Sequence, residues 1–214
     1  IEHATSGFTY GDDTLGLIQT VLDQVQAKVG FLNRILVPQI VNSLFGLAYS
    51  RPEDLTGTIS ETFTNTRFRG KVFSAAICLD VKDVVKAIQI CLKINENVKL
   101  AGVLAFRFVK GNAATLAFTR FKHSVVMELD GADAAVNHQF YQAVLESLEA
   151  AAIPYTIHWG KLNRIVDKNR LNYIYGNEKI QQWKKQRSRV MTQEVQQLFN
   201  NEFMQQCGLD GYIP

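Results

Sequence analysis

A strand pattern in the middle of the chain restricts the fold more than any other feature. The segment VLAFRFV, residues 103–109, alternates large apolar residues with a second set that includes Arg107. Successive side chains of a strand point to opposite faces, so Arg107 is expected on the face opposite the phenylalanines. Residues 114–121 and 124–129 show two further strand patterns, and Lys110 to Asn112 supply a turn. The sequence therefore predicts three sequential antiparallel strands.

Helical patterns surround this region. Residues 71–79 alternate as another strand, and Asp80 is expected to cap the helix that follows it. Asp133 opens a further helix, Pro154 ends it, and residues 155–159 are extended. The tail over 177–206 is predicted to be one long helix that stops before Gly208. The first expected apolar stripe is Val84, Val85, Ile88, Cys91 and Leu92. The second is Val136, Phe140, Val144, Leu145 and Leu148, with Tyr141 beside it.

The N-terminal part is predicted to be helical. Apolar residues recur at helical spacing from Thr14 to about Gly30, and a second helix, broken or kinked at Pro38, extends to about Tyr49. Together with the strands, this order favours an α+β fold in which an antiparallel sheet carries helices on one face. We expect one structural domain with a helical segment over 1–69, the sheet and its helices over 70–176, and a C-terminal helix and tail over 177–214.

Composition and charge exclude several classes of protein. The formal net charge of +3 and the scattered basic residues do not favour nucleic-acid binding. Cys78, Cys91 and Cys207 show no metal-ligand spacing and are odd in number, so neither a disulfide framework nor a metal site is expected. No signal peptide is visible and the polar residues within 31–49 argue against a membrane span, which favours a cytoplasmic protein. The chain starts without Met, so a fragment of a longer protein is expected.

Self-contained catalytic signatures are missing from the sequence. There is no glycine-rich dinucleotide loop, phosphate loop, HExxH or GxSxG motif. A chain of this size without such a signature is expected to be either a binding module or part of a larger enzyme.

The segment YTIHWGKLN, residues 155–163, contains the strongest remaining pattern. An imidazole such as His158 can act as acid, base or hydrogen-bond partner near neutral pH. Lys161 could stabilise negative charge that develops on a nearby oxygen or flavin, and Gly160 permits close approach of the backbone to a flat ring. The alternative is that His158 ends a strand and Lys161 is a solvated residue that begins a helix.

The segment HWGKLN resembles the His-Trp-Gly/Ala-Lys motif near the C-terminus of FAD-linked sugar-alcohol and aldonolactone oxidases, of the vanillyl-alcohol oxidase superfamily. Upstream, AFRFVKGNAATL resembles the strand of those enzymes that carries Glu-x-Arg, and HQFYQAVLESLEAAAIPY resembles the helix before their His-Trp motif. The resemblance covers roughly residues 70–214. It implies a cap domain with an antiparallel sheet over the flavin, whose FAD is held mainly by a domain outside this chain.

The resemblance also implies roles for individual residues. His158 and Lys161 would be the catalytic residues beside the flavin, and Trp159, Gly160 and Lys161 would contact the cofactor. No metal is implied.

Arg107 matches the arginine of Glu-x-Arg, which binds substrate hydroxyls. The glutamate of that pair is replaced by Ala105, which weakens the expectation of a polyol substrate, and Glu128 on a neighbouring strand could supply the missing carboxylate. A solvated strand end is the other interpretation of Glu128.

Three functional hypotheses follow. The first is the substrate-binding cap of an FAD-dependent oxidoreductase that oxidises a C–OH group of a small hydroxylated substrate by hydride transfer to flavin; its partner would be the FAD-binding domain of the same protein, and this chain would be inactive alone. The second is a non-enzymatic α+β binding module. The third is association with a membrane surface through residues 31–49.

Overall fold

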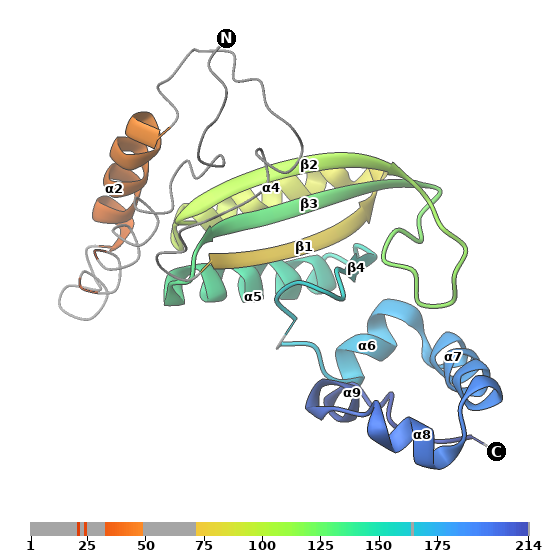
Figure 1. Cartoon of the computed structure of the whole chain (residues 1–214). Coiled ribbons are helices and arrows are strands. Elements are labelled where there is room, and N and C mark those ends of the chain that lie inside the picture. The colour runs from red at the N-terminus through yellow and green to blue at the C-terminus, as the bar shows by residue number, and fades with distance from the viewer. Residues whose placement is uncertain (1–20, 22–23, 25–32, 49–71, 164, 214) are drawn as a thin grey trace, which may run out of the picture. The chain divides into compact units, whose positions relative to one another are not determined.

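The computed structural model describes residues 33–48, 72–163 and 165–213, together with Val21 and Gln24 (Figure 1). Val21 and Gln24 are helical, and the rest of the helix expected before Gly30 lies outside the described residues. The boundary expected between residues 69 and 70 also lies outside them.

Four strands form one antiparallel sheet in the order β2-β3-β1-β4. The strands are β1 (Val72–Asp80), β2 (Gly102–Lys110), β3 (His123–Ala132) and β4 (Tyr155–Ile157). β1 pairs with β4 in antiparallel register, with Cys78 opposite Thr156. Figure 1 shows the three long strands side by side, with α4 (Val84–Asn95) lying against the sheet. The predicted α+β fold is confirmed.

The prediction of a strand over 114–121 is wrong. Residues 111–122 form the connection between β2 and β3 and contain no strand. Asn112 closes this connection on itself, because its N–H donates to the carbonyl of Thr119 at 2.6 Å and its side chain accepts from the N–H of Ala114. The apolar alternation is used for packing instead: Phe118 and Phe121 lie against the buried cluster of Ala76, Cys78 and Val126.

The helices next to the sheet follow the sequence pattern in part. Asp80 accepts from the N–H of Lys82 and caps the short helix η2 (Val81–Asp83), as expected. All five residues of the stripe predicted for α5 (Ala135–Ala150) are buried, and so is Tyr141 beside it. In α4 the prediction is partly wrong, because Val85 and Leu92 are 66% and 60% exposed. The buried residues of α4 are instead Val84, Ala87 and Cys91, which recur at three- and four-residue steps.

The prediction of a single long helix over 177–206 is also wrong. The tail contains α7 (Asn177–Val190), α8 (Gln193–Leu198) and α9 (Glu202–Gln206), after α6 (Lys168–Tyr175). Met191 is extended, and Thr192 and Asn201 cap new helices with their side chains. Gly208, at φ 64°, follows α9 in the left-handed region, which confirms the predicted stop.

A buried arginine holds these C-terminal helices together. Arg187 of α7 is 8% exposed and donates to the carbonyls of Leu209 and Gln196 and to the side-chain oxygen of Asn200. Its guanidinium therefore joins α7, the end of α8 and the residues after α9. A continuous helix could not bring these acceptors to one side chain.

The helix predicted near Pro38 is present as α2 (Asn33–Ala48), with Pro38 inside it. Val37 is buried in a cluster with four residues from later in the chain, namely Ala101, Ala132, Ala134 and Val136. None of the helices in the described part of the chain is long and apolar enough to cross a bilayer.

The chain divides into two compact units. One contains α2 and residues 72–74, 91–103 and 129–144, and the other contains residues 75–90, 104–128 and 145–213. In the first unit Phe73 of β1 contacts the rings of His138 and Tyr141 of α5 edge-on. All the site residues predicted from the sequence belong to the second unit.

Asn137 is the buried polar residue on which the first unit depends. Its side chain accepts from the N–H of Ala101 at 2.7 Å and donates to the carbonyls of Ala101 and Ala132. We expect Asn137→Ala to lower the free energy of unfolding by about 2–4 kcal/mol, because it leaves buried backbone groups without partners. Urea unfolding measures this loss. Gln139→Ala, an exposed change on the same helix, should stay within about 0.5 kcal/mol; equal effects of the two changes would contradict the assignment.

Candidate functional site

The carboxylate of Glu128 on β3 forms the centre of an ion-pair cluster. One of its oxygens, Oε2, accepts from Nε of Arg107 on β2 at 2.7 Å. The other, Oε1, accepts from Nζ of Lys161, beyond β4, at 3.1 Å. Three of the residues predicted for the site therefore meet in one cluster, hereafter the Glu128 cluster.

The sheet explains how these residues meet. β2 and β3 are neighbours, so Arg107 and Glu128 can face each other across the two strands. β1 lies between β3 and β4 and presents the small residue Ala76 on the same face as Val126 and Glu128. Lys161 reaches Glu128 from the segment that follows β4.

The hydrogen bonds and charges of its two partners keep Glu128 ionised although its side chain is largely buried. Its side chain is 12% exposed, whereas those of Lys161 and Arg107 are 21% and 70% exposed. Burial alone would raise the pKa of Glu128, but the hydrogen bonds and charges of Arg107 and Lys161 outweigh burial, and the pKa lies below its ordinary value. The cluster contains two cations and one anion, so it carries one net positive charge.

His158 lies beside the cluster without a described contact to its carboxylate. Its backbone N–H donates to the carbonyl of Ala76, and its ring meets Phe118 edge-on at 4.9 Å. Nδ1 of the ring accepts from the N–H of Gly160 at 3.1 Å. In the neutral ring this bond leaves the proton on Nε2, which can then donate to a ligand.

Trp159 is held by packing contacts. Its indole N–H donates to the carbonyl of Leu116 at 3.0 Å, and its ring stacks on Tyr175 with centroids 5.8 Å apart and an angle of 10°. Phe203 of α9 meets the same ring edge-on. The predicted contact of Trp159 with a cofactor stays a prediction, because the described contacts of its indole are all with protein groups.

The connection over 111–122 is fastened at three successive carbonyls. Besides the bond from Trp159 to Leu116, the hydroxyl of Tyr175 donates to Ala117 at 3.4 Å and the hydroxyl of Thr156 donates to Phe118. We call the backbone carbonyl groups of residues 116–118 the clamped carbonyls. Sequence reasoning missed this arrangement, since the pattern of 114–121 indicated a strand.

A second buried network, also missed, supports the segment that carries Lys161. Glu149 at the end of α5 accepts from the hydroxyl of Tyr155 at 2.5 Å and from Nε of Arg170 at 2.7 Å. Arg170 of α6 also donates to the carbonyl of Ile165. Burial raises the pKa of Glu149, but the hydrogen bonds from Arg170 and Tyr155 and the charge of Arg170 together outweigh burial, and the pKa lies below its ordinary value. The sequence contains no signal for this pairing.

The remaining candidate groups give no second cluster. Cys78, Cys91 and Cys207 are buried thiols, and burial raises the pKa of Cys91 to about 12. Tyr173 is 47% exposed, while Tyr175 is buried under Trp159. In the described part of the chain, no three His, Cys, Asp or Glu side chains are grouped so that they could hold a metal ion.

Comparisons of the chain with models of protein families, with curated proteins and with solved structures found no match.

The pKa of Glu128 makes the stability of the cluster depend on pH. Because the folded-state pKa is lowered, ionised Glu128 contributes stability above its unfolded value of about 4.3 and loses it as pH falls through the folded value. We expect Glu128→Gln to cost about 1–2 kcal/mol near pH 7 and progressively less below pH ~4.3. Urea unfolding between pH 3 and 7 measures the difference. Glu96→Gln at an exposed carboxylate is the control, and a pH-independent cost at Glu128 would contradict the ion pairing.

The clamped carbonyls predict graded losses at Trp159. Trp159→Phe keeps a ring but removes the bond to Leu116, and should cost about 1 kcal/mol. Trp159→Ala also removes the stacking on Tyr175 and should cost about 3–5 kcal/mol. Thermal and urea unfolding of the isolated chain measure both losses. Phe108→Ala, at an aromatic that is 75% exposed, should have little effect, and an equally small loss for Trp159→Ala would refute the packing role.

Proposed function

We propose that this chain is the substrate-binding part of an FAD-dependent oxidoreductase that oxidises a C–OH group of a small hydroxylated substrate. The observation that carries the proposal is the meeting of Arg107, Glu128 and Lys161 in the Glu128 cluster. These residues were singled out by their resemblance to the oxidase motifs or by their place in the sequence beside them.

The cluster contains a carboxylate that could replace the glutamate missing from the oxidase pattern. Ala105 occupies the position where the family carries a glutamate two residues before its arginine. Glu128 supplies a carboxylate from the next strand and bonds the arginine in question, Arg107. A carboxylate and a guanidinium side by side offer both acceptors and donors, which suits the hydroxyl groups of a polar substrate.

Lys161 is the residue best suited to stabilise negative charge. Its ammonium group is four-fifths buried, where an electrostatic interaction is stronger than in bulk water. The hydrogen bond to Glu128 holds the amine in place. His158, through Nε2, could hold or donate a proton at the same edge of the sheet.

The residues of this chain fit a flavin that is bound mainly by another domain. A positively charged cluster suits a reduced, negatively charged ring, and Gly160 is exposed, so its backbone can be approached closely. When bound, the flavin would accept the hydride. Trp159 would act through packing, since it fixes the segment that carries His158 and Lys161.

The binding-module hypothesis makes the opposite prediction about chemistry. If the Glu128 cluster only recognises a ligand, the full-length gene product would contain no flavin and have no redox activity. Helix α2 gives less support to the membrane-surface hypothesis, because its residue Val37 already packs against other residues of the chain.

Lys161 is the residue through which the proposal is tested. The full-length gene product should be yellow and show the flavin absorption bands. In that protein we expect Lys161→Met to lower kcat/KM by about a hundredfold or more, because it removes a charge that acts in the transition state. Steady-state kinetics under matched flavin loading measures the effect.

Lys179→Ala in α7 is the matched control, since this lysine is exposed and should leave kcat/KM within about twofold. A full-length protein without flavin, or unchanged kinetics for Lys161→Met, would refute the proposal.

A further inference from the structure

The stretch between Glu96 and Glu128 contains no acidic residue. Over these positions, 97–127, the sequence carries five lysines and arginines and one histidine: Lys99, Arg107, Lys110, Arg120, Lys122 and His123. Glu128 partners Arg107, as described above. Of these residues, Lys110, Arg120, Lys122 and His123 lie in or next to the connection over 111–122, which has no acidic side chain of its own and therefore attracts anions.

Arg120 lies within this region between two aromatic rings. Its guanidinium carbon is 5.0 Å from the ring centroid of Phe121 and 5.7 Å from that of Tyr175. Such cation–π contacts orient a guanidinium but use none of its five N–H donors. Among the described residues Arg120 makes no hydrogen bond and no ion pair, so these donors have no described protein acceptor.

The donors of Arg120 are nevertheless accessible. Its side chain is only partly buried, and none of its nitrogens belongs to the fully buried polar atoms that lack a partner. The group therefore reaches the surface with its N–H edge open to solvent or to a ligand. A half-buried guanidinium in this state favours an anionic acceptor over water, because burial has removed part of its hydration.

The neighbouring titratable groups do not neutralise this charge. Burial raises the pKa of the Cys78 thiol and of the Tyr175 phenol, so both are neutral at pH 7. Burial also lowers the pKa of Arg120, although an arginine stays charged at neutral pH. The described surroundings thus leave one cation without a counter-charge.

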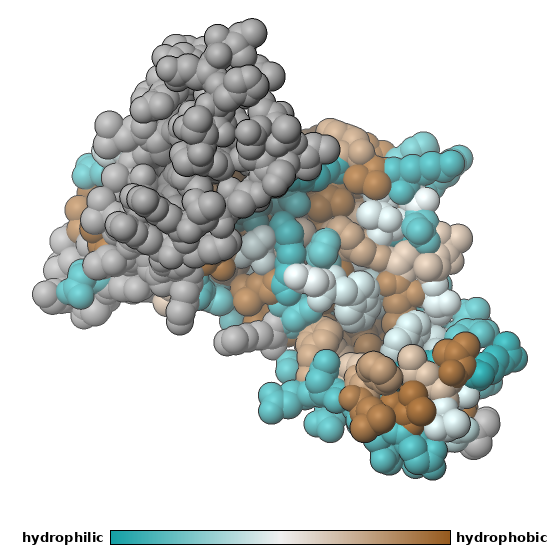
Figure 2. Space-filling view, in the orientation of Figure 1, coloured by the Kyte–Doolittle hydropathy of each residue, from teal (hydrophilic) through white to brown (hydrophobic). Residues whose placement is uncertain are grey.

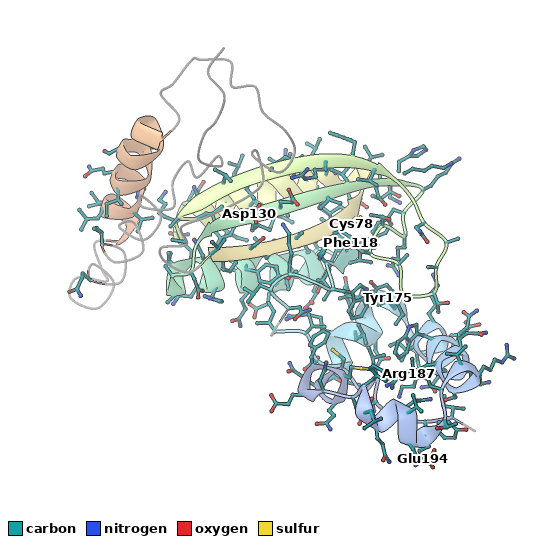
Figure 3. All side chains as sticks on the ribbon, viewed as in Figure 1. Cys78, Phe118, Asp130, Tyr175, Arg187 and Glu194 are labelled. Carbon is teal, nitrogen blue, oxygen red and sulfur yellow. The ribbon has the colours of Figure 1, made fainter. Side chains whose placement is uncertain are left out.

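The clamped carbonyls make the position of Arg120 rigid. The hydroxyl of Tyr175 bonds the carbonyl of Ala117, and the indole of Trp159 both stacks on Tyr175 and bonds Leu116. Figure 3 shows Phe118 of this connection next to Cys78 at the end of the sheet, and it shows Tyr175 at the end of helix α6. A planar fork held in one place loses little entropy on binding, and this geometry matches two oxygens of one group.

We propose that Arg120, held between Phe121 and Tyr175, binds an oxyanion, namely the carboxylate or phosphate group of a small ligand. The site uses none of the residues of the Glu128 cluster. The inference therefore does not depend on the proposed oxidase function, and each can fail without the other.

An NMR titration of the ¹⁵N-labelled chain tests this site. The probes are inorganic phosphate and acetate, each added at constant ionic strength with chloride as the balancing ion. We expect saturable shifts of the Arg120 Nε–H signal, which is assigned by its loss in Arg120→Lys, with at least one of the two anions. The anion that binds identifies which oxyanion chemistry the site prefers.

Two variants separate a specific site from general attraction to positive charge. Arg120→Gln should weaken binding at least tenfold, because it removes a charge-assisted pair of hydrogen bonds. Lys122→Gln, an exposed residue two positions away, removes the same charge and should weaken binding less than threefold. Arg120→Lys keeps the charge and should fall between them, and far-ultraviolet circular dichroism checks that each variant is folded.

Three results would overturn the proposal. The first is the absence of saturable shifts with both anions in the unaltered chain. The second is equal weakening by Arg120→Gln and Lys122→Gln, which would indicate diffuse attraction only. The third is an unaltered affinity in folded Arg120→Gln.

Discussion

The carboxylate of Glu128 is the constraint on which the arrangement of the candidate site depends. An ionised acid whose side chain is 12% exposed needs partners for both oxygens, because an unpaired buried charge is costly. Arg107 and Lys161 provide them from opposite sides. The pairing requires β2 to present Arg107 on the face of Glu128, and it requires a chain that continues past β4 to Lys161. Each of these requirements is met by a residue in the sequence.

The segment over 155–163 combines two tasks that the sequence could not separate. Thr156 and Trp159 hold the connection between β2 and β3 through the clamped carbonyls. His158 and Lys161, on the same few residues, provide groups that can exchange or stabilise charge. The packing residues therefore determine where the charged residues lie. This division explains why an aromatic residue that packs against Tyr175 and Phe203 sits between two polar ones.

Local patterns predicted much of the fold. The strands β1, β2 and β3, the cap at Asp80 and the stripe of α5 were predicted from patterns of neighbouring residues, and all are confirmed. The failures arise where distant residues decide the outcome. Residues 114–121 alternate like a strand, but their carbonyls bond the side chains of Thr156, Trp159 and Tyr175. The tail has helical spacing throughout. Side-chain caps at the starts of α8 and α9, and the hydrogen bonds from Arg187 to backbone carbonyls, nevertheless divide it into separate helices.

The site shows the same limit. The strand pattern placed Arg107 opposite the phenylalanines, and the missing glutamate at Ala105 directed attention to Glu128. The bond between Glu128 and Lys161 joins residues 33 positions apart, and no spacing in the sequence indicates it. The position of the Arg120 guanidinium also depends on the ring of Tyr175 in α6, which lies 55 positions further along the chain.

The most direct test of the account is a double-mutant cycle on kcat/KM in the flavin-containing full-length protein, with Glu128→Gln, Lys161→Met and both changes together. If the pair acts as a unit, the double variant should be hardly slower than the worse single variant, and the coupling should be about 1 kcal/mol or more. Strictly additive losses would show that the two residues act independently and would contradict the account.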